Sequence, residues 1–587
     1  MGGECSGAPV APPVTAATAP GSGRRVREAT AGDRYHRTVP APAPSAADGP
    51  AATEPDRAPT AGPVPRPLAV VAVAAVVVGV VARFVAPTPL WLDEALSADI
   101  AALPVGDLLD ALGRDGHPPL YYLVLHGWMR VVGTGDVAVR ALSGLVSVAA
   151  LPLVYLAGRR RGGPVLATVA LTVLALSPFA IRYATEARMY SLVVLEVLLG
   201  WLLVDDLVAG RASRWRAPAL AVVSGALLLT HYWAVPLLGA TVVVLAVAWW
   251  RSPPGGADRR GLRTAGLAVA VGGLAFLPWL PTFADQVAHT GTPWAPPTRP
   301  SAAVGAVLRD VAGGPLDDGV LAAVVLAVLA VVGLLGRPGG PGRIELVLRT
   351  VPTVRPEAAV AGLTLVGGAT VAYLGGSAVV TRYAAVVLAL VVLVVAAGVV
   401  CVTPTRAQVA VLVVLCATGL TGVVAQLSED RTQAGDVAAA VEARLAQPGA
   451  GERDAAVVVT CPDQLGPATA RALWGPPPLG ADPEPGRPAV LAYPALDDPR
   501  LVDWYDYADR AAAADPAAAA ERVLAEAGPD GSVVLVWHTT YRGFEGQCEA
   551  LRDALSRARP GAEDLVRADG AAFFEPATVT WFPPVAR

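Results

Sequence analysis

The sequence predicts a polytopic α-helical membrane protein that ends in a small α/β domain. Only 16% of its 587 residues are charged, whereas soluble domains carry about 25%. Apolar stretches recur between residues 68 and 426, and about 20 apolar residues are enough to cross the hydrocarbon core of a bilayer. Beyond residue 429 they give way to short apolar runs that alternate with helical patterns, which is typical of an α/β domain.

The chain begins with a segment that differs from the rest. Residues 1–66 are rich in Ala, Pro, Gly and Thr and show no periodicity, which predicts a disordered tail. The apolar run 68–86 then predicts the first span. We expect no removable signal peptide there, because such signals start close to the N-terminus.

Further apolar stretches complete a bundle of about 11 predicted spans. They lie at 138–157, 164–181, 189–209, 217–232, 234–250, 264–282, 319–336, 358–375, 384–402 and 407–426. The run 217–250 is divided because a single helix of that length would reach about 50 Å, too long for a bilayer. The stretch 118–132 is instead predicted to be an amphipathic helix on the outer surface, begun by proline in its first turn.

The distribution of arginine predicts the orientation. Arginines gather in alternate loops, which the positive-inside rule places in the cytoplasm. These arginines are Arg159, Arg160, Arg161, Arg211, Arg214, Arg216, Arg251, Arg259, Arg260, Arg263, Arg337, Arg343, Arg349, Arg355 and Arg406. The N-terminal tail is then cytoplasmic, and the acidic first loop, 87–137, lies outside the plasma membrane together with the C-terminal domain.

The predicted organisation therefore has three parts: the tail 1–66, a transmembrane domain 67–428 and an extracytoplasmic α/β domain 429–587. In the last part, strands are predicted at 457–460, 490–492, 533–537 and 579–581, and helices at 437–445, 516–527 and 546–556. Cys461 follows one strand and Cys548 opens one helix. Outside the cell the two can pair, and both a disulfide and two free thiols remain open.

Ionisable and aromatic residues gather at the outer ends of the predicted spans. They come from five separate parts of the chain and can surround one outward-facing cavity. The candidates are Asp93, Glu94, His117, Tyr121, Tyr122, Arg182, Glu186, Arg188, Tyr190, His231, Arg382 and Tyr383. Charge near hydrocarbon is costly, so each charged member is a functional-site hypothesis. We expect charged residues at span ends only.

The chemistry of these residues suits a lipid-linked substrate. Nucleotide donors are not available outside the membrane, and the sequence has no Gly-rich phosphate loop and no His/Cys spacing typical of zinc. Arginine offers a fixed fork of donors to a phosphate, and a carboxylate takes a proton from an acceptor hydroxyl. Carboxylates, arginines and aromatics together favour transfer of a sugar from a polyprenyl phosphate.

Three strings, in this order, carry a family resemblance. They are WLDEALSADIA at 91–101, DGHPPLYY at 115–122 with VRALS at 139–143, and LSPFAIRYATEARMYSL at 176–192. They are similar to bacterial GT-C glycosyltransferases of the protein O-mannosyltransferase-like branch (glycosyltransferase family 39 and its relatives). The resemblance is strong over about 90–200 and weaker around LLLTHYW and VTRYAAVV. It implies a helical bundle, a polyprenyl-phosphate sugar as donor, mannose by family habit, and inversion at the anomeric carbon.

The resemblance also implies roles for single residues. Asp93 is the expected general base, and Glu94 is expected to orient Asp93, the acceptor or a divalent cation. Arg188 and Arg382 are expected to hold the donor phosphate. The need for a metal stays open, as does the nature of the acceptor, which is a glycan, a lipid or a protein.

Other interpretations of the same residues remain. Asp93 can simply cap a helix over 94–103, and Arg182 with Glu186 can form a structural ion pair at a span end. His231, in an apolar hairpin, is more often structural than part of a site. For the whole protein, a multi-span transporter or lipid flippase is the alternative, which predicts charges near the bilayer midplane and internal repeats.

Overall fold

The computed structural model describes residues 62–585 except 212, 293–294, 314–318, 348–351 and 481–487. All of them belong to one compact unit, Ala58–Arg587. The predicted tail 1–66 lies outside the described residues apart from 62–66, so its disorder stays a prediction.

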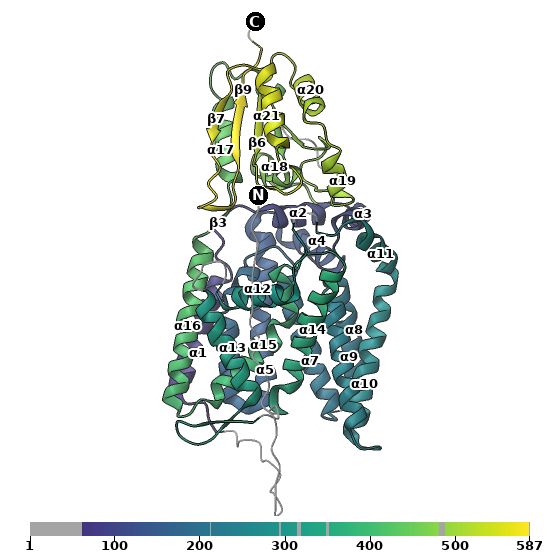
Figure 1. The fold of residues 1–587 in the computed structure, drawn as a ribbon, viewed down its shortest axis with the longest axis vertical. Coiled ribbons are helices and arrows are strands. Elements are labelled where there is room, and N and C mark those ends of the chain that lie inside the picture. The colour runs from purple at the N-terminus through teal and green to yellow at the C-terminus, as the bar shows by residue number, and fades with distance from the viewer. Residues whose placement is uncertain are drawn as a thin grey trace, which may run out of the picture. The chain divides into compact units, whose positions relative to one another are not determined.

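A bundle of apolar helices forms the membrane part (Figure 1). Its elements are α1 (Arg66–Ala82), α5 (Asp136–Ala175), α7 (Tyr190–Val208), α8 (Arg216–Thr230), α9 (Ala234–Arg251), α10 (Ala257–Gly273), η1 (Leu274–Trp279), α11 (Leu280–His289), α13 (Gly319–Leu335), α14 (Arg355–Leu374), α15 (Ala385–Cys401) and α16 (Thr405–Ser428). In the described part of the chain, six helical runs are long and apolar enough to cross a membrane, and α1, α8 and α13 are shorter apolar helices. Each predicted span coincides with one of these helices or with part of one, and the exact number of crossings stays a prediction.

α5 has 40 residues but consists of two antiparallel arms. Its backbone leaves helical geometry at Gly162 and Gly163. Arg83, just after α1, donates to Ser147 Oγ in the first arm and to Ala175 O in the second. In a straight helix, Ser147 and Ala175 would lie about 42 Å apart. The chain therefore folds back at the two glycines, and the two segments predicted here are the two arms.

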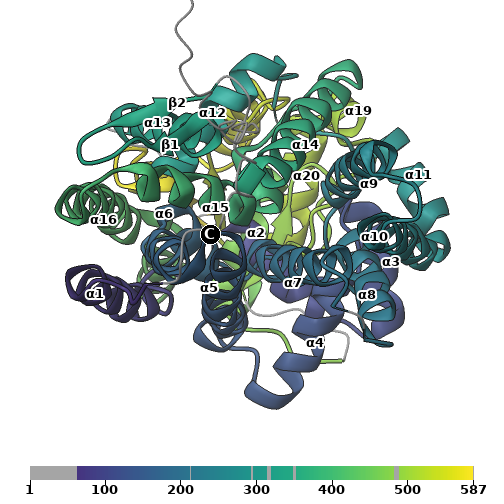
Figure 2. The same cartoon turned by 90° about the horizontal axis from the view of Figure 1, so that it is seen from below.

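α15 lies in the middle of the bundle (Figure 2). In the run Thr381–Cys401, 89% of the residues in the most apolar 18-residue window are buried. This is expected for a helix that is apolar on all sides. α15 packs against α5, α7, α13 and α14. Residues at its N-terminal end are therefore close to several other helices.

One charged residue departs from the expectation that charges lie only at span ends. Glu196 is buried inside α7, where Thr230 of α8 donates a hydrogen bond of 3.1 Å to its Oε1. The expectation is wrong at this position. Membrane helices tolerate such a residue when it faces a neighbouring helix rather than lipid.

Short helices form a layer at one end of the bundle: α2 (Leu92–Ala102), α3 (Val105–Asp115) and α4 (Leu120–Val132) (Figure 1). α4 buries Tyr121, Tyr122 and Leu125 and exposes Val124 and Val131. The predicted amphipathic helix over 118–132 is therefore confirmed. Two further short helices, α6 (Pro178–Ala184) and α12 (Pro300–Ala312), connect longer ones, and a small hairpin of β1 (Gly336–Pro338) and β2 (Ile344–Leu346) follows α13.

The C-terminal region contains a five-stranded sheet in the order β5-β4-β6-β9-β7. β4 pairs in parallel with β5 and β6, whereas β9 is antiparallel to β6 and β7. The elements are β3 (Asp430–Thr432), α17 (Ala434–Leu445), β4 (Val457–Cys461), α18 (Gly466–Trp474), β5 (Ala489–Ala492), α19 (Tyr507–Ala512), α20 (Pro516–Ala527), β6 (Val533–Trp537), α21 (Gln547–Ala558), β7 (Glu563–Val566), β8 (Phe573–Glu575) and β9 (Thr578–Phe582). The predicted strands and helices are all present, and β3, β7, β8, α18 and α19 are additional.

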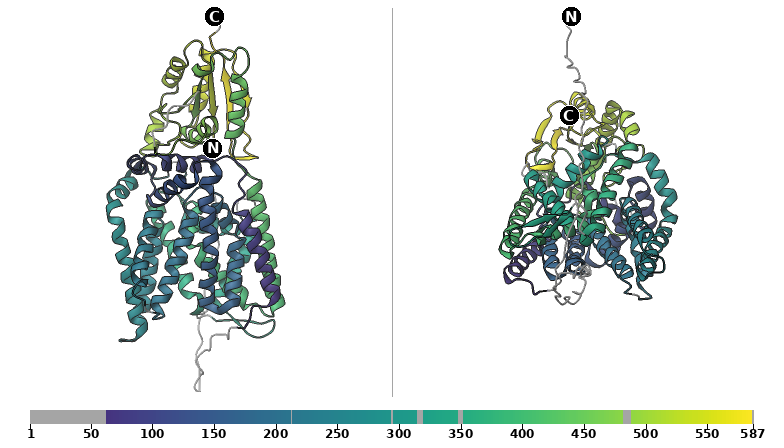
Figure 3. Two further views of the ribbon diagram at one scale, coloured as in Figure 1. Left: turned by 180° about the vertical axis from the view of Figure 1, so that it is seen from behind. Right: turned by 60° about the horizontal axis from the view of Figure 1, so that its bottom comes forward.

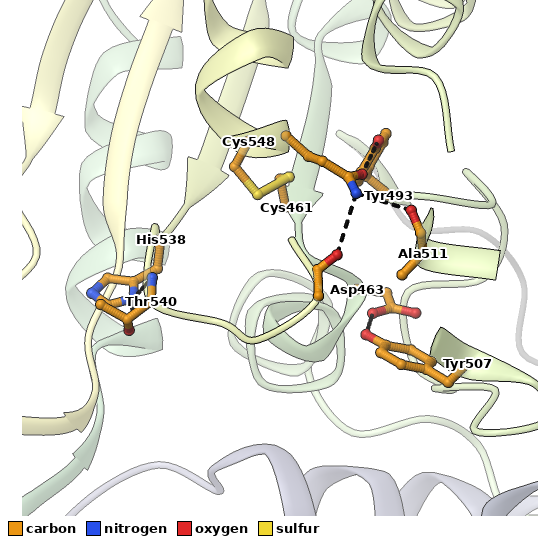
Figure 4. The surroundings of a disulfide bond; sticks show 10 residues. Cys461, Asp463, Tyr493, Tyr507, Ala511, His538, Thr540 and Cys548 are labelled. Carbon is orange, nitrogen blue, oxygen red and sulfur yellow. Dashed lines mark hydrogen bonds between the residues drawn. A yellow bond between two sulfur atoms is a disulfide. The ribbon is translucent and has the colours of Figure 1, made fainter. Parts of the chain in front are cut away.

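Two cysteines join the sheet to a helix that covers it (Figure 4). Cys461 at the end of β4 and Cys548 in α21 form a disulfide, with their Cα atoms 5.6 Å apart. Next to it, Asp463 accepts a hydrogen bond from Tyr507 OH at 2.5 Å. The pairing that the sequence left open is therefore present.

The C-terminal region contacts the layer of short helices (Figure 3). α18 packs on α2. Arg471 of α18 donates to Asp136 Oδ1 at 2.8 Å and to Thr134 O at 2.6 Å, and its Nη1 lies 3.5 Å from Asp99 Oδ1. This contact holds the C-terminal region over the helix that carries Asp93 and Glu94.

Candidate active site

Asp93 lies in the first turn of α2 and faces two arginines from other parts of the chain. Its Oδ2 is 2.5 Å from Arg382 Nη1 and 3.9 Å from Arg188 Nη2. Trp91 is the N-cap residue of α2, and its side chain makes no capping hydrogen bond. The interpretation of Asp93 as a simple helix cap therefore does not describe its contacts.

Arg188 connects Asp93 to the loop between α3 and α4. Its Nη2 lies 3.0 Å from His117 Nε2, and its Nη1 donates to Ser97 Oγ at 2.8 Å. His117 Nδ1 is 2.7 Å from Asp115 Oδ2. Because a guanidinium only donates and a carboxylate only accepts, these two partners assign a neutral His117 with its proton on Nδ1. The result is a continuous chain of polar contacts from Asp115 through His117 and Arg188 to Asp93.

The arginines decide the charge of Asp93. Burial alone would raise its pKa, but Arg382 and then Arg188 outweigh this effect, so the pKa of Asp93 lies below its usual value. The carboxylate is therefore ionised at neutral pH and able to accept a proton. Arg188 Nε and Tyr190 OH are buried without a hydrogen-bond partner among the described residues, so the site keeps donors for a ligand.

Glu94 points to a different set of partners. Arg140 donates to both of its oxygens at 2.7 and 2.6 Å, and the Ala187 N–H donates to Oε1 at 2.9 Å. Burial opposes ionisation, but Arg140 and Arg431 hold the pKa of Glu94 below its usual value. Glu94 thus ties α2 to α5 and to the loop that precedes Arg188.

Aromatic rings line the side of the site near Arg382. The Tyr190 and His231 ring centroids are 5.7 Å apart, and those of His231 and Tyr383 are 5.3 Å apart. His231 and Tyr190 are buried. Tyr183 extends this row, with its ring centroid 4.7 Å from that of Tyr190. Of these ring residues, Tyr190, His231 and Tyr383 were predicted as site residues, and they meet in one cluster beside Arg382, which was also predicted.

Three predicted residues lie at the edge of this arrangement. Arg182 Nε is 3.4 Å from Glu186 Oε1 in an i,i+4 ion pair, which is the structural alternative proposed for them. Tyr121 OH lies 3.5 Å from Ser143 Oγ, whereas Tyr122 OH donates to Asp115 and is 3.4 Å from Arg188 Nη1. Of the two neighbouring tyrosines, only Tyr122 joins the polar contacts around Asp93.

A divalent cation, whose need the sequence left open, does not fit the Asp93–Glu94 pair. The two carboxylates face different arginines and share no donor set. Among residues 62–585, with the gaps given above, no group of three His, Cys, Asp or Glu side chains is placed to hold a metal ion. A cation at either carboxylate would have to displace an arginine from it.

Several residues of the site were not predicted from the sequence. Ser97 and Asp115 lie within the quoted strings, and Ser97 is four residues after Asp93 on the same helix face. Arg140 also lies within a quoted string and has a buried side chain. Arg431 gave no sequence signal, because it lies more than 300 residues from Glu94 in the chain.

Comparison with known proteins supports the fold. Residues 116–279 match the family described as dolichyl-phosphate-mannose-protein mannosyltransferase. The structure of ArnT from Cupriavidus metallidurans in the apo state is similar, with 15% identity, coverage of 86% of this chain and 97% of ArnT, and a TM-score of 0.53. The structure of the same protein bound to undecaprenyl phosphate gives 12% identity, coverage of 87% and 97%, and a TM-score of 0.50.

A more distant similarity is to the oligosaccharyltransferase AglB from Archaeoglobus fulgidus, with 12% identity, coverage of 83% of this chain and 72% of AglB, and a TM-score of 0.43, which is too low to support an argument. No curated protein matches this sequence. At these identities, the likeness to solved structures establishes the fold alone. The chain thus has the GT-C glycosyltransferase fold of ArnT, and its segment 116–279 matches the dolichyl-phosphate-mannose-protein mannosyltransferase family.

Proposed function

We propose that the protein transfers a sugar from a polyprenyl-phosphate donor to an acceptor hydroxyl at the outer face of the plasma membrane. The observation that carries the proposal is the Asp93 carboxylate placed between Arg188 and Arg382. This reaction needs a base and cations that can hold a phosphate, and each of the two arginines lies within 4 Å of the Asp93 carboxylate. The structure of ArnT bound to undecaprenyl phosphate supports a donor of this class.

The membrane part has an apolar pocket that we assign to the lipid portion of the donor. It lies between α5, α6, α12, α13, α15 and α16. Its lining includes Leu326, Leu388, Val391 and Leu415, and aliphatic side chains of this kind suit a prenyl chain. A donor that enters from the bilayer brings its phosphate to the outer end of α15, where Arg382 lies.

In the proposed reaction, the acceptor oxygen attacks the anomeric carbon from the face opposite the leaving phosphate. The acceptor O–H proton passes to Asp93, and the bond between the anomeric carbon and the phosphate oxygen breaks. The released polyprenyl phosphate carries one more negative charge than it had in the donor. Arg188 and Arg382 stabilise this charge through their guanidinium groups, and a single displacement inverts the anomeric centre.

The arginines also couple the basicity of Asp93 to the binding of the donor. In the empty site, they hold the pKa of Asp93 low, which makes Asp93 a weak base. When the donor phosphate takes over part of their charge, their influence on Asp93 falls and its pKa rises. Donor binding therefore prepares Asp93 to accept the proton.

The remaining parts of the proposal follow the sequence. Residues 67–428 form the catalytic membrane domain and 429–587 an extracytoplasmic domain, with the N-terminus in the cytoplasm and mannose as the sugar. The aromatic stretch Trp504–Tyr507 packs locally, since Tyr505 stacks on His289 and Tyr507 donates a hydrogen bond to Asp463. The acceptor is a glycan, lipid or protein hydroxyl.

The test is sugar transfer by the purified full-length protein. The donors are radiolabelled polyprenyl-phosphate sugars, beginning with mannose, and the acceptors are cell-envelope fractions. Asp93→Asn removes the base without changing side-chain size, so transfer should fall by about 10²-fold or more. Asp107→Asn is the matched control, because Asp107 is an exposed carboxylate of the neighbouring helix α3.

Retained transfer in Asp93→Asn, with an unchanged thermal transition, would contradict the assigned base. Transport of a labelled lipid into proteoliposomes without any covalent product would favour the transporter or flippase instead. The orientation has its own test. A cysteine introduced at Asp107 should react with a membrane-impermeant maleimide added to intact cells, and protection there would contradict the outer placement.

A further inference from the structure

The first turn of α2 depends on the C-terminal region for one of its hydrogen bonds. The first N–H groups of a helix have no partner within it, and no side chain of α2 itself supplies an acceptor. The Leu92 N–H is instead met by Glu575 of β8, with Oε2 at 3.2 Å and Oε1 at 3.3 Å. Glu575 is only 5% exposed. Leu92 is directly next to Asp93.

The surrounding contacts fix Glu575 in this place. β8 pairs in parallel with β3, with Thr432 opposite Glu575. The Phe574 ring packs edge-on against the Trp91 ring, with centroids 5.5 Å apart. Arg431 of β3 donates to Thr185 O at 2.9 Å and to Thr185 Oγ1 at 2.7 Å. One two-stranded ribbon therefore contacts both the first turn of α2 and the loop that leads to Arg188.

The site favours an uncharged Glu575. Burial raises the pKa of Glu575 to about 8, although the Leu92 N–H and the Thr432 side chain oppose this effect, and Asp93 and Glu94 add to the rise. At neutral pH, the group is then a carboxylic acid whose oxygen still accepts from Leu92. It holds the helix without placing a third negative charge beside Asp93 and Glu94. A glutamine can make the same contact.

We propose that Glu575 is a positioning residue for the transfer reaction, which holds the first turn of α2 through the Leu92 N–H and so places Asp93 against Arg188 and Arg382. The inference rests on the proposed function, in which Asp93 is the base. It assigns the C-terminal region a part in catalysis: a residue more than 480 positions along the chain from Leu92 sets the geometry of the base. A displacement of about 1 Å at such a group is enough to slow a reaction by up to 10²-fold.

The test uses full-length protein in lipid nanodiscs and four variants. Glu575→Ala removes the acceptor, Glu575→Asp shortens it by one methylene so that it no longer reaches Leu92, and Glu575→Gln keeps it. Glu563→Ala is the matched control, because Glu563 is an exposed carboxylate of β7 in the five-stranded sheet, paired with Arg444. Hydrogen exchange of the amides at the start of α2 is measured by mass spectrometry, together with kcat and KM for polyprenyl-phosphate mannose.

Glu575→Ala and Glu575→Asp should exchange faster at the start of α2 and lose about 10- to 100-fold in kcat, with the donor KM within about twofold. Glu575→Gln and Glu563→Ala should match the wild type in both measurements. A purely structural role would not give rescue by glutamine together with a change confined to kcat. If exchange and kcat in Glu575→Ala equal those of Glu563→Ala, the inference is overturned. If the wild type itself transfers no sugar, the proposed function fails, and the exchange data still decide whether Glu575 holds α2.

Discussion

At the residue scale, the proposed base Asp93 is both held in place and kept ionised by its arginine partners. Its Oδ2 is 2.5 Å from Arg382 Nη1, which fixes its rotamer and keeps it ionised. The same contact makes it a weak base, so its reactivity depends on what the arginine binds next. His117 has a related role, because it joins Arg188 to Asp115 and limits where that guanidinium can move.

This arrangement predicts a particular pH dependence. Because the pKa of Asp93 in the free enzyme is lowered, kcat/KM should stay constant as pH falls from neutral to about 4 and drop only below its usual pKa. Arg382→Gln removes the largest favourable charge, so the pKa of Asp93 should rise and the acid limb should move to higher pH, with kcat lower by about 10²-fold. Initial rates between pH 3.5 and 8 measure both effects. An acid limb at the same pH in both proteins would contradict the assignment.

A second prediction concerns stability in the C-terminal region. Burial raises the pKa of Asp463 to about 7, although the Tyr507 hydroxyl opposes this effect. A carboxyl group with a raised pKa in the folded state contributes stability below its unfolded pKa, near 4, and loses it as pH rises to about 7.

Asp463→Asn cannot ionise, so it should be more stable than the wild type at pH 8 by on the order of 2–4 kcal/mol. The difference should disappear near pH 4. Thermal unfolding followed by tryptophan fluorescence at both pH values measures it. An equal difference at pH 8 and pH 4 would show that ionisation of Asp463 is not the cause.

At the element scale, glycine allows the backbones of two neighbouring helices to lie close together. Gly398 lies in α15, where an added Cβ would come 1.9 Å from Leu329 O of α13. No side chain fits there without separating the two backbones. Small residues at such contacts are the usual means by which membrane helices pack closely.

Gly398→Ala should therefore destabilise the protein, by about 2 kcal/mol or more, as overpacking does in a well-packed interior. Gly239→Ala in α9 is the control, because nothing lies within 4 Å of its added Cβ. In a helix, glycine is about 0.5–1 kcal/mol worse than alanine, so this change should be neutral or stabilising. Thermal unfolding in detergent compares the two, and equal transitions would contradict the close packing of α13 and α15.

At the scale of the whole molecule, the C-terminal region contacts α2 near both of its ends. Glu575 contacts Leu92 at its start, and Arg471 lies near Asp99 in its last turns. The side chains of Arg471 and Asp99 are 5% and 3% exposed. Removing one partner of a buried ion pair leaves a buried charge and costs about 3–5 kcal/mol, whereas removing both costs much less.

Arg471→Met should therefore lower the thermal transition of the full-length protein, and Arg471→Met with Asp99→Asn should recover part of the loss. The double-mutant cycle on unfolding free energies measures the coupling between them. Additive effects would show that the contact does not join the C-terminal region to α2.

Much of the fold was accessible from the sequence, because it depends on local patterns. Runs of apolar residues placed the helices of the bundle, and the amphipathic pattern of 118–132 predicted α4. The kink in α5 follows from Gly162 and Gly163, which adopt backbone angles outside the helix. The strands β3 and β8 were missed because each has only three residues, too short for a period-two pattern to show.

The sequence by itself determined which residue types stand at the ends of the apolar helices, since side-chain chemistry and hydropathy are read position by position. Only the tertiary structure decided that Asp93 meets Arg382, that Glu94 meets Arg140 instead, and that Glu575 reaches Leu92. These partners lie 46 to 483 positions apart in the chain. Contacts over such separations follow from how helices and strands pack together, and no local pattern in the chain encodes them.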